Sequence, residues 1–115
     1  MKWKDVVRLA LELPFVTEDF WFNTPSLKVR GKGFVRLKED RQSIVFLLES
    51  VAQQGLLIAS QPGIYFITDH YRGYPAVLAR LAPLRTAECR LRLERAWRVQ
   101  APKKLIKLRD EKRSG

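Results

Sequence analysis

The sequence predicts an α+β domain, in which an antiparallel sheet and helices on one of its faces form two packed layers. Apolar residues recur at helical spacing in three segments: at the start of the chain, in its middle and near its end. Between these segments lie two runs that are rich in aromatic and β-branched residues and are divided by turn residues. The resulting order is helix, three or four strands, helix, two strands, helix.

The first helix is predicted over residues 2–13 and is ended by Pro14. Its apolar face is formed by Trp3, Val6, Val7, Ala10 and Leu13. A meander of three or four short antiparallel strands is predicted within residues 17–48, and its last strand spans residues 43–48. The turns between these strands are expected at Asn23-Thr24-Pro25, at Gly31-Lys32-Gly33 and at residues 39–42.

The second helix is predicted to begin at Ser50, because Ser50 and Gln53 have the spacing of a capping box. It runs to about Ser60, where Pro62-Gly63 stops it. Gly55 weakens the centre of this helix by about 1 kcal/mol relative to alanine.

The two remaining strands are predicted at residues 64–67 and 76–81, as a hairpin with a long connection over residues 68–75. Thr86 can cap the third helix. One face of this helix carries Cys89, Leu93, Ala96 and Trp97. Pro102 then breaks the helix or starts a short continuation.

The composition is that of one globular domain. The chain has 115 residues, of which 46% are hydrophobic, and this excludes an intrinsically disordered protein. A single domain is predicted over residues 1–108, and residues 109–115 are expected to form a polar, frayed tail. No apolar stretch is long enough for a secretory signal or a membrane span. We therefore expect a cytoplasmic protein without a membrane partner, and a monomer is favoured.

Catalytic and metal chemistry are not indicated. With one cysteine, Cys89, and one histidine, His70, the chain can form neither an intrachain disulfide nor a Cys/His zinc site, so no metal or cofactor is expected. Cys89 falls on the apolar face of a predicted helix, where a buried thiol is inert. Asp69 precedes His70, but neighbours in an extended loop point in opposite directions. A non-enzymatic protein is therefore expected.

The charge is strongly basic and unevenly distributed. The net charge is +10, and residues 80–115 contribute +8 of it through twelve Lys or Arg and four Asp or Glu. Such a surface can neutralise phosphates. For the third helix a solvated face is favoured, because two of its arginines follow a glutamate by four positions: Glu88 and Arg92, Glu94 and Arg98. Lys103 and Lys104 have no such partners and are better candidates for binding an anion.

Two other segments combine basic residues with turns or aromatic rings. The loop at residues 69–74 contains His70, Tyr71, Arg72 and Tyr74. Aromatic rings stack on unpaired bases and arginine binds phosphate or guanine, although a loop anchored by its tyrosines is the favoured alternative. The turn at residues 28–33 contains Lys28, Arg30 and Lys32. A basic hairpin tip can reach a nucleic-acid backbone, and protection of a sheet edge explains it equally well.

Several segments taken together resemble a known family. The first comprises Trp3-Lys4-Asp5-Val6, Leu13-Pro14 and Thr24-Pro25-Ser26-Leu27-Lys28-Val29-Arg30-Gly31-Lys32. The second is Asp69-His70-Tyr71-Arg72-Gly73-Tyr74-Pro75-Ala76-Val77-Leu78, and the third comprises Ala96-Trp97-Arg98 and Ala101-Pro102-Lys103-Lys104-Leu105. In order and spacing, from about residue 2 to residue 108, these segments resemble the MmcQ/YjbR-like family.

The resemblance implies an α+β fold similar to type III secretion chaperones and a DNA-binding protein with a double-wing motif. It also implies that the hairpin around Gly31-Lys32-Gly33 and the loop around Tyr71-Arg72-Gly73 are the wings. This chain departs from the family pattern at Gly55 and in residues 49–54, and its basic tail is longer.

Residues and resemblance together predict a non-enzymatic domain that binds nucleic acid. Phosphates would be contacted by Lys28, Arg30, Lys32, Arg72, Lys103 and Lys104, while His70, Tyr71 and Tyr74 would shape or stack in the site. The alternative is a protein- or peptide-interaction module with an exposed apolar sheet face, which would include Phe20, Trp21 or Phe22.

Overall fold

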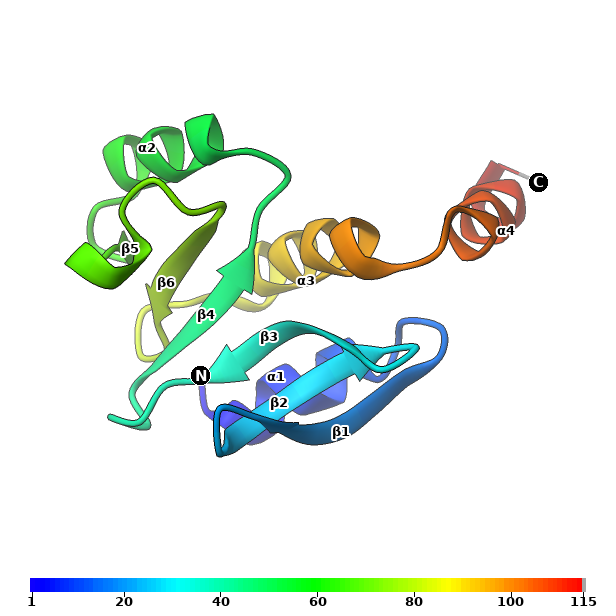
Figure 1. Ribbon diagram of the computed structural model, residues 1–115, viewed down its shortest axis with the longest axis horizontal. Coiled ribbons are helices and arrows are strands. Elements are labelled where there is room, and N and C mark those ends of the chain that lie inside the picture. Colours follow the sequence, from blue (N-terminus) through cyan, green and yellow to red (C-terminus); the bar gives the residue numbers. More distant parts are fainter. Residues whose placement is uncertain (115) are drawn as a thin grey trace.

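Helices α1 (Trp3–Ala10) and α3 (Thr86–Gln100) lie behind a six-stranded antiparallel sheet in the computed structural model, which describes residues 1–114 (Figure 1). In spatial order the strands are β1 (Val16–Trp21), β2 (Thr24–Val29), β3 (Lys32–Leu37), β4 (Ser43–Leu47), β6 (Ala76–Arg80) and β5 (Tyr65–Phe66). The remaining elements are α2 (Val51–Ser60), which contacts β5 and β6, the 3-10 turn η1 (Asp69–Tyr71) and α4 (Lys103–Ser114). The α+β class and the order of its elements are confirmed.

The two faces of the sheet differ in what covers them. Residues opposite each other in neighbouring strands share a face, so Leu27, Val35 and Phe46 lie on one face and all three are fully buried. Tyr65 lies on that face through its partner Ala79, and its hydroxyl donates to the Glu88 carboxylate on α3. This is therefore the face that α1 and α3 cover. The opposite face, here called the open face, carries the partners Ser26, Arg36, Val45 and Leu78.

Trp97 anchors α3 over the covered face. Its indole is fully buried, and its Nε1 donates a hydrogen bond to the backbone oxygen of Pro14, 3.1 Å away. Pro14 follows α1, which ends at Ala10 rather than at the predicted Leu13. Leu13 is nevertheless buried, because the turn after α1 folds back against the core. Trp97 thus joins α3 to the segment that follows α1.

The strand turns lie one residue earlier than predicted. Both connections are two-residue loops with positive φ at each position: Phe22 and Asn23 (54° and 61°) and Arg30 and Gly31 (51° and 82°). This is the pattern of type I′ turns, whose twist matches that of the flanking strands. Thr24, Pro25, Lys32 and Gly33 therefore belong to strands rather than to turns.

Two predicted helix caps are not formed. The amide oxygen of Gln53 accepts a hydrogen bond from the backbone N–H of Glu49 (3.1 Å), one residue before Ser50, and the Ser50 side chain caps nothing among the described residues. Thr86 is the first helical residue of α3, and Arg85 occupies the cap position. In both cases the local pattern predicted the helix correctly, and the path of the preceding loop decided which residue faces the free amides. Helix α2 reaches Ser60 despite Gly55.

The described end of the chain is helical. The tail was predicted over residues 109–115, of which residue 115 lies outside the described residues, and α4 continues to Ser114. Arg109 binds Glu94 of α3 at 2.6 Å, and Arg98 of α3 binds Asp110 of α4. These ion pairs join residues 12 and 15 positions apart, so local sequence could not reveal them.

The predicted hairpin of the second strand run is confirmed. Tyr65 of β5 pairs with Ala79 of β6 in an antiparallel arrangement, and η1 lies within the connection. The connection is held by Gln54 on α2, whose side chain is buried. Its Nε2 lies 2.8–3.0 Å from the backbone oxygens of Tyr71, Tyr74 and Ala76. A single amide from another element therefore positions the loop.

Candidate functional site

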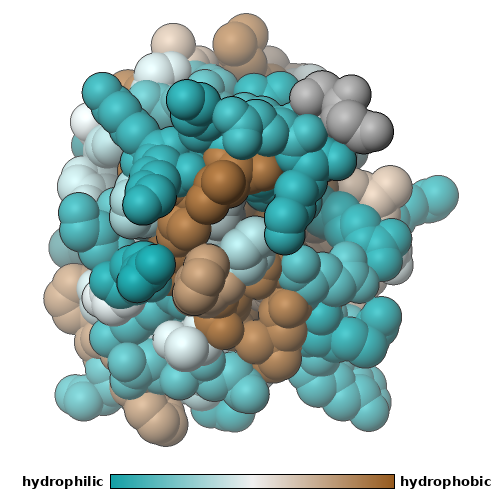
Figure 2. Space-filling model, turned by 90° about the vertical axis from the view of Figure 1, so that its right-hand side faces the viewer, coloured by the Kyte–Doolittle hydropathy of each residue, from teal (hydrophilic) through white to brown (hydrophobic). Residues whose placement is uncertain are grey.

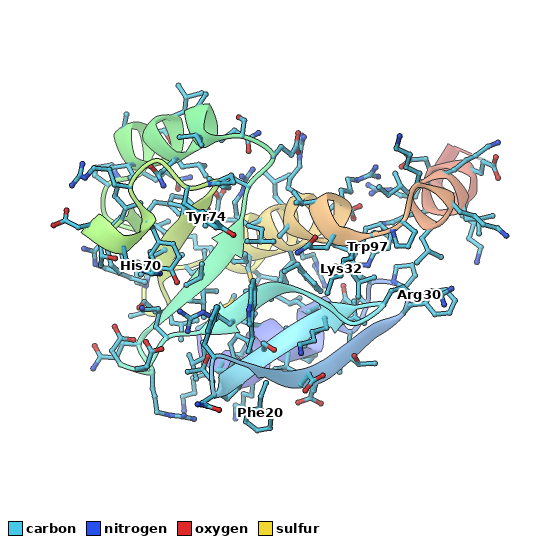
Figure 3. The ribbon with its side chains drawn as sticks, viewed as in Figure 1. Phe20, Arg30, Lys32, His70, Tyr74 and Trp97 are labelled. Carbon is cyan, nitrogen blue, oxygen red and sulfur yellow. The ribbon has the colours of Figure 1, made fainter. Side chains whose placement is uncertain are left out.

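The structure separates the predicted site residues into two groups at opposite ends of the molecule. Figure 3 shows Arg30 and Lys32 towards the end where α4 lies, whereas His70 and Tyr74 lie towards the other end. The amide Nε2 of Gln100, at the end of α3, donates to the backbone oxygen of Gly33 at 2.9 Å. This bond holds the start of α4 beside the β2–β3 turn. The first group therefore consists of Arg30, Lys32, Lys103 and Lys104, and is called the basic end.

The cations of the basic end are exposed and have no carboxylate partner among the described side chains. Lys32, Lys103 and Lys104 are exposed, and none of them forms an ion pair within residues 1–113. The guanidinium carbon of Arg30 lies 4.5 Å from the centre of the Phe15 ring, which holds the side chain without neutralising it. Figure 2 views this end of the molecule and shows hydrophilic side chains around an apolar strip.

Lys28 differs from these four residues. Its ammonium lies 3.3 Å from the Asp19 carboxylate on the neighbouring strand β1, and its side chain is half-buried. The Lys28 charge is therefore partly neutralised within the sheet. Lys28 therefore does not offer an unpaired charge to a ligand, unlike the four residues of the basic end.

The arginines of α3 are mostly paired, as the favoured interpretation expected. Arg90 binds Glu12 at 3.1 Å and Arg95 binds Glu49 at 3.3 Å. The predicted pair of Glu94 and Arg98 is present at 3.0 Å. The predicted pair of Glu88 and Arg92 is wrong, because the Glu88 carboxylate accepts the Tyr65 hydroxyl instead. Burial, the hydrogen bond to Glu88 and its negative charge raise the pKa of Tyr65.

The residues of the second group, at η1, differ in burial and in charge pairing. Tyr71 is buried, while His70, Arg72 and Tyr74 are exposed. Arg72 donates to the Asp69 carboxylate at 3.0 Å, so these two charges neutralise each other. The His70 ring meets the edge of the Tyr71 ring, with 4.9 Å between centres. His70 has no hydrogen bond to Asp69 among the described residues, so the sequential pair does not form a catalytic dyad in this geometry.

Around η1, the open face of the sheet contains a cavity of about 290 Å³. Its floor is apolar and is formed by Val45, Leu47 and Ala76. One wall is made by Tyr71, Tyr74 and His70, and the other by Trp21 at the end of β1 and Phe22 in the β1–β2 turn. We call this cavity the aromatic pocket. The three residues of the first wall were predicted to bind nucleic acid. They therefore line the same pocket as Trp21 and Phe22, which were predicted only for the alternative function, protein or peptide binding.

Arg36 is the residue of the pocket that sequence reasoning missed. Its side chain lines the pocket, although the residue is only 5% exposed. Nη2 donates to the Tyr71 hydroxyl at 2.8 Å, and Nη1 lies 3.2 Å from both the Thr24 hydroxyl and the Glu39 carboxylate. An available signal was a charged residue inside the apolar run Phe34-Val35-Arg36-Leu37, because a buried arginine requires partners.

The carboxylate of Glu39 is shared by Arg36 and Lys38. Glu39 also lies 3.2 Å from the Lys38 ammonium, and its side chain is 62% exposed. Hydrogen bonds from its own backbone N–H and from the side chains of Lys38 and Arg36 lower the pKa of Glu39 to about 2. Glu39 is therefore ionised at neutral pH, and one negative charge serves two cations.

The described residues provide neither a reactive thiol nor a metal cluster. Burial raises the pKa of the Cys89 thiol to about 12, so this group stays protonated at neutral pH. No cluster of three or more His, Cys, Asp or Glu side chains that could hold a metal ion occurs within the part of the chain that the structure describes. Among the same residues, no helix combines the length and the apolar character needed to span a bilayer.

The comparisons with known proteins agree with this fold. The YjbR family model matches residues 11–99, which is most of the chain. The chain belongs to the YjbR family. Curated relatives in Mycobacterium tuberculosis and Mycobacterium bovis are 33% identical over 118 aligned residues, covering 90% of this chain and 92% of theirs. All three are named uncharacterized proteins.

A solved structure extends the comparison to three dimensions. The crystal structure of Deinococcus radiodurans protein DR2400, with a domain named DUF419, aligns with a TM-score of 0.70 at 16% identity. The alignment covers 85% of this chain and 77% of that chain. At this identity the likeness establishes the shared fold. The predicted family and its fold are thus confirmed, while the roles of the site residues stay predictions.

Proposed function

We propose that the protein binds nucleic acid through the phosphate backbone at its basic end. The observation that carries this proposal is the contrast between two sets of cations. Arg90, Arg95 and Arg98 on α3 are occupied by carboxylates, whereas Lys32, Lys103 and Lys104 have none within residues 1–113. Unpaired cations that two distant segments bring to one end of a molecule favour an anionic partner.

The chemistry of the basic end suits phosphate rather than base recognition. Lysine ammonium groups act as point charges, and contacts to phosphates position a protein without reading sequence. Each neutralised phosphate of duplex DNA contributes about −0.9 to the slope of log K against log salt. Contacts from all four residues would therefore give a slope of about −3.6.

A salt titration with matched charge variants tests this proposal. The wild type and Lys103→Ala/Lys104→Ala are titrated against labelled duplex DNA by fluorescence anisotropy, from about 50 to about 200 mM salt. The control is Arg41→Ala/Arg85→Ala, which removes two exposed arginines that also have no ion pair among residues 1–113. We expect the lysine variant to flatten the slope by about two units and the control to leave it unchanged.

Two results would overturn the proposal. Equal slopes for the two double variants would mean that total charge, and not the basic end, determines binding. Loss of all binding at physiological salt would make the basic end a solvated surface. Low-salt binding alone has no weight, because a protein of net charge +10 binds polyanions under those conditions.

Edge strand β1 supports a second candidate function, binding of a protein or peptide. Four of its six residues are exposed, and Phe20 is 65% exposed. An unpaired strand edge can accept an extended peptide as an additional strand. If duplex binding fails at physiological salt, this function takes first place. Phe20→Ala should then weaken peptide binding measured by calorimetry, while the lysine variant should not.

A further inference from the structure

We propose that the aromatic pocket on the open face binds a small, flat aromatic ring that carries a carboxylate. This site is separate from the proposed phosphate contacts, because no residue of the basic end lines it and two of its residues, His70 and Tyr74, lie away from Arg30 (Figure 3).

Arg36 offers hydrogen-bond donors that the protein does not use. A guanidinium has five N–H groups, and within residues 1–113 Arg36 donates to three acceptors: Thr24, Glu39 and Tyr71. The Tyr71 hydroxyl accepts one of these bonds, and its own hydrogen has no acceptor among the same residues. The Arg36 Nε has no hydrogen bond within residues 1–113 and is not fully buried, so it is open to solvent or to a ligand with acceptor oxygens in the pocket.

The charge around the pocket favours an anion over a cation. Arg36 and Lys38 share the single carboxylate of Glu39, at 3.2 Å from each. The Lys38 ammonium also lies 5.5 Å from the centre of the Tyr71 ring, next to the pocket wall. The neighbouring Arg72 and Asp69 neutralise each other. Lys38 also lies near the Asp40 carboxylate and lowers its pKa, so Arg36, which lines the pocket, is the cation that a bound carboxylate would pair with and that would repel an ammonium ligand.

The aromatic walls suit a flat ring. The rings of Trp21 and Phe22 are stacked with centres 5.7 Å apart. The rings of Tyr71, in η1, and of Tyr74, just after it, line the same pocket with centres 6.5 Å apart. Phe22 is 70% and Tyr74 53% exposed, so much of their apolar surface is available to a guest. A cavity of about 290 Å³ is at the small end of ligand sites, which suits one or two fused rings.

Both walls are held in place by specific features of the backbone. Phe22 adopts a φ of 54°, a conformation in which a bulky residue is strained. Glycine or asparagine would form the same turn with less strain. A strained residue in their place often marks a functional position. Gly33 lets the Trp21 indole lie directly on β3, and Gln54 holds the backbone of Tyr71 and Tyr74. The pocket is therefore organised before a ligand enters.

A pair of probes that differ only in charge tests the proposal. Binding of 2-naphthoate and of the neutral 2-naphthamide is followed by NMR titration of the full chain, using the backbone amides and the Trp21 indole N–H. We expect naphthoate to bind with a dissociation constant of about 1 mM or below. Naphthamide should bind at least about tenfold more weakly, because it cannot make charge-assisted hydrogen bonds to Arg36.

Matched variants locate the site. Phe22→Gly removes one wall at a turn position where glycine is preferred, so the fold should be retained, and naphthoate affinity should fall at least about tenfold. Phe20→Ala is the control, because Phe20 is an exposed ring on the adjoining strand β1 that does not line the pocket, and affinity should not change. Arg36→Met should remove the preference for naphthoate over naphthamide. If Arg36→Met does not fold, Lys38→Gln should reduce that preference instead.

Three outcomes would overturn the proposal: no shift of pocket resonances by naphthoate, equal affinity for naphthoate and naphthamide, or equal losses from Phe22→Gly and Phe20→Ala. All these variants leave the basic end intact. A failure here therefore concerns the aromatic pocket alone, and duplex titration still decides the proposed function.

Discussion

Replacing Gly33 by alanine should destabilise the protein through one contact. A Cβ at Gly33 would lie 2.5 Å from Cε3 of Trp21 and 2.9 Å from two further ring carbons, closer than such atoms ever approach. The φ of Gly33 is not in the left-handed region, so alanine brings no backbone strain there. The clash with the Trp21 indole is therefore the cause of any loss.

The size of the effect follows from how the indole can respond. Trp21 is half-buried on edge strand β1, so it can move off β3 at the cost of its packing. Overpacking of this kind costs about 1–3 kcal/mol. For 115 residues, the unfolding entropy near the midpoint gives about 4 °C of Tm per kcal/mol, so we expect a decrease of about 4–12 °C.

Thermal and urea unfolding followed by circular dichroism measure this prediction. The matched control is Gly55→Ala in α2, where an added Cβ meets no atom within 4 Å. It should raise stability by up to about 1 kcal/mol, because glycine disfavours a helix interior. In a Trp21→Leu background, Gly33→Ala should cost little. An equal cost in both backgrounds would refute the reasoning, because the clash with Trp21 would then not be responsible.

Two further predictions concern titratable groups. Burial alone would raise the pKa of Glu94, but its hydrogen bond to Arg109 and the charges of Arg109, Arg98 and Arg113 lower it below 4.5. The folded state therefore binds the proton less well than the unfolded state, and this stabilisation is present above about pH 5 and is lost in acid. In urea unfolding, Glu94→Gln should lower the free energy of unfolding at pH 7 and flatten the decline of that free energy between about pH 5 and pH 3. A parallel decline in the variant and the wild type would contradict this. Burial raises the pKa of the Cys89 thiol to about 12. A disulfide reagent at about pH 8 should therefore modify the native protein at least about 100-fold more slowly than the protein unfolded in urea. Equal rates would exclude a buried thiol.

Local periodicity predicted the elements of the fold well. The apolar spacing of Cys89, Leu93, Ala96 and Trp97 correctly identified the buried face of α3, since helical period alone decides which side chains share a face. The β5–β6 hairpin was also predicted. The boundaries were less accurate, because turn type and cap geometry depend on the path of the loop as well as on residue identity. Thus Phe22 stands in a turn that the sequence had placed around Thr24.

The candidate site was predicted only in part. Lys103 and Lys104 were distinguished by helical spacing as cations without partners, and neither forms an ion pair within residues 1–113, while their role stays a prediction. The pocket could not be predicted, since it depends on Arg36 meeting Tyr71, 35 positions away, and Thr24, 12 positions away. Neither partner follows from the pattern of β3 alone.

What the sequence by itself determined is the order of elements, their apolar faces and the concentration of positive charge after residue 80. Each of these depends on neighbours within a few positions or on composition. Only the tertiary structure decided which cations are neutralised, that the predicted site residues form two groups, and that Trp21 and Phe22 face Tyr71 and Tyr74 across a pocket. Those outcomes require side chains from distant segments to meet within a few ångströms, and packing of the sheet and helices, rather than any local pattern, determines such distances.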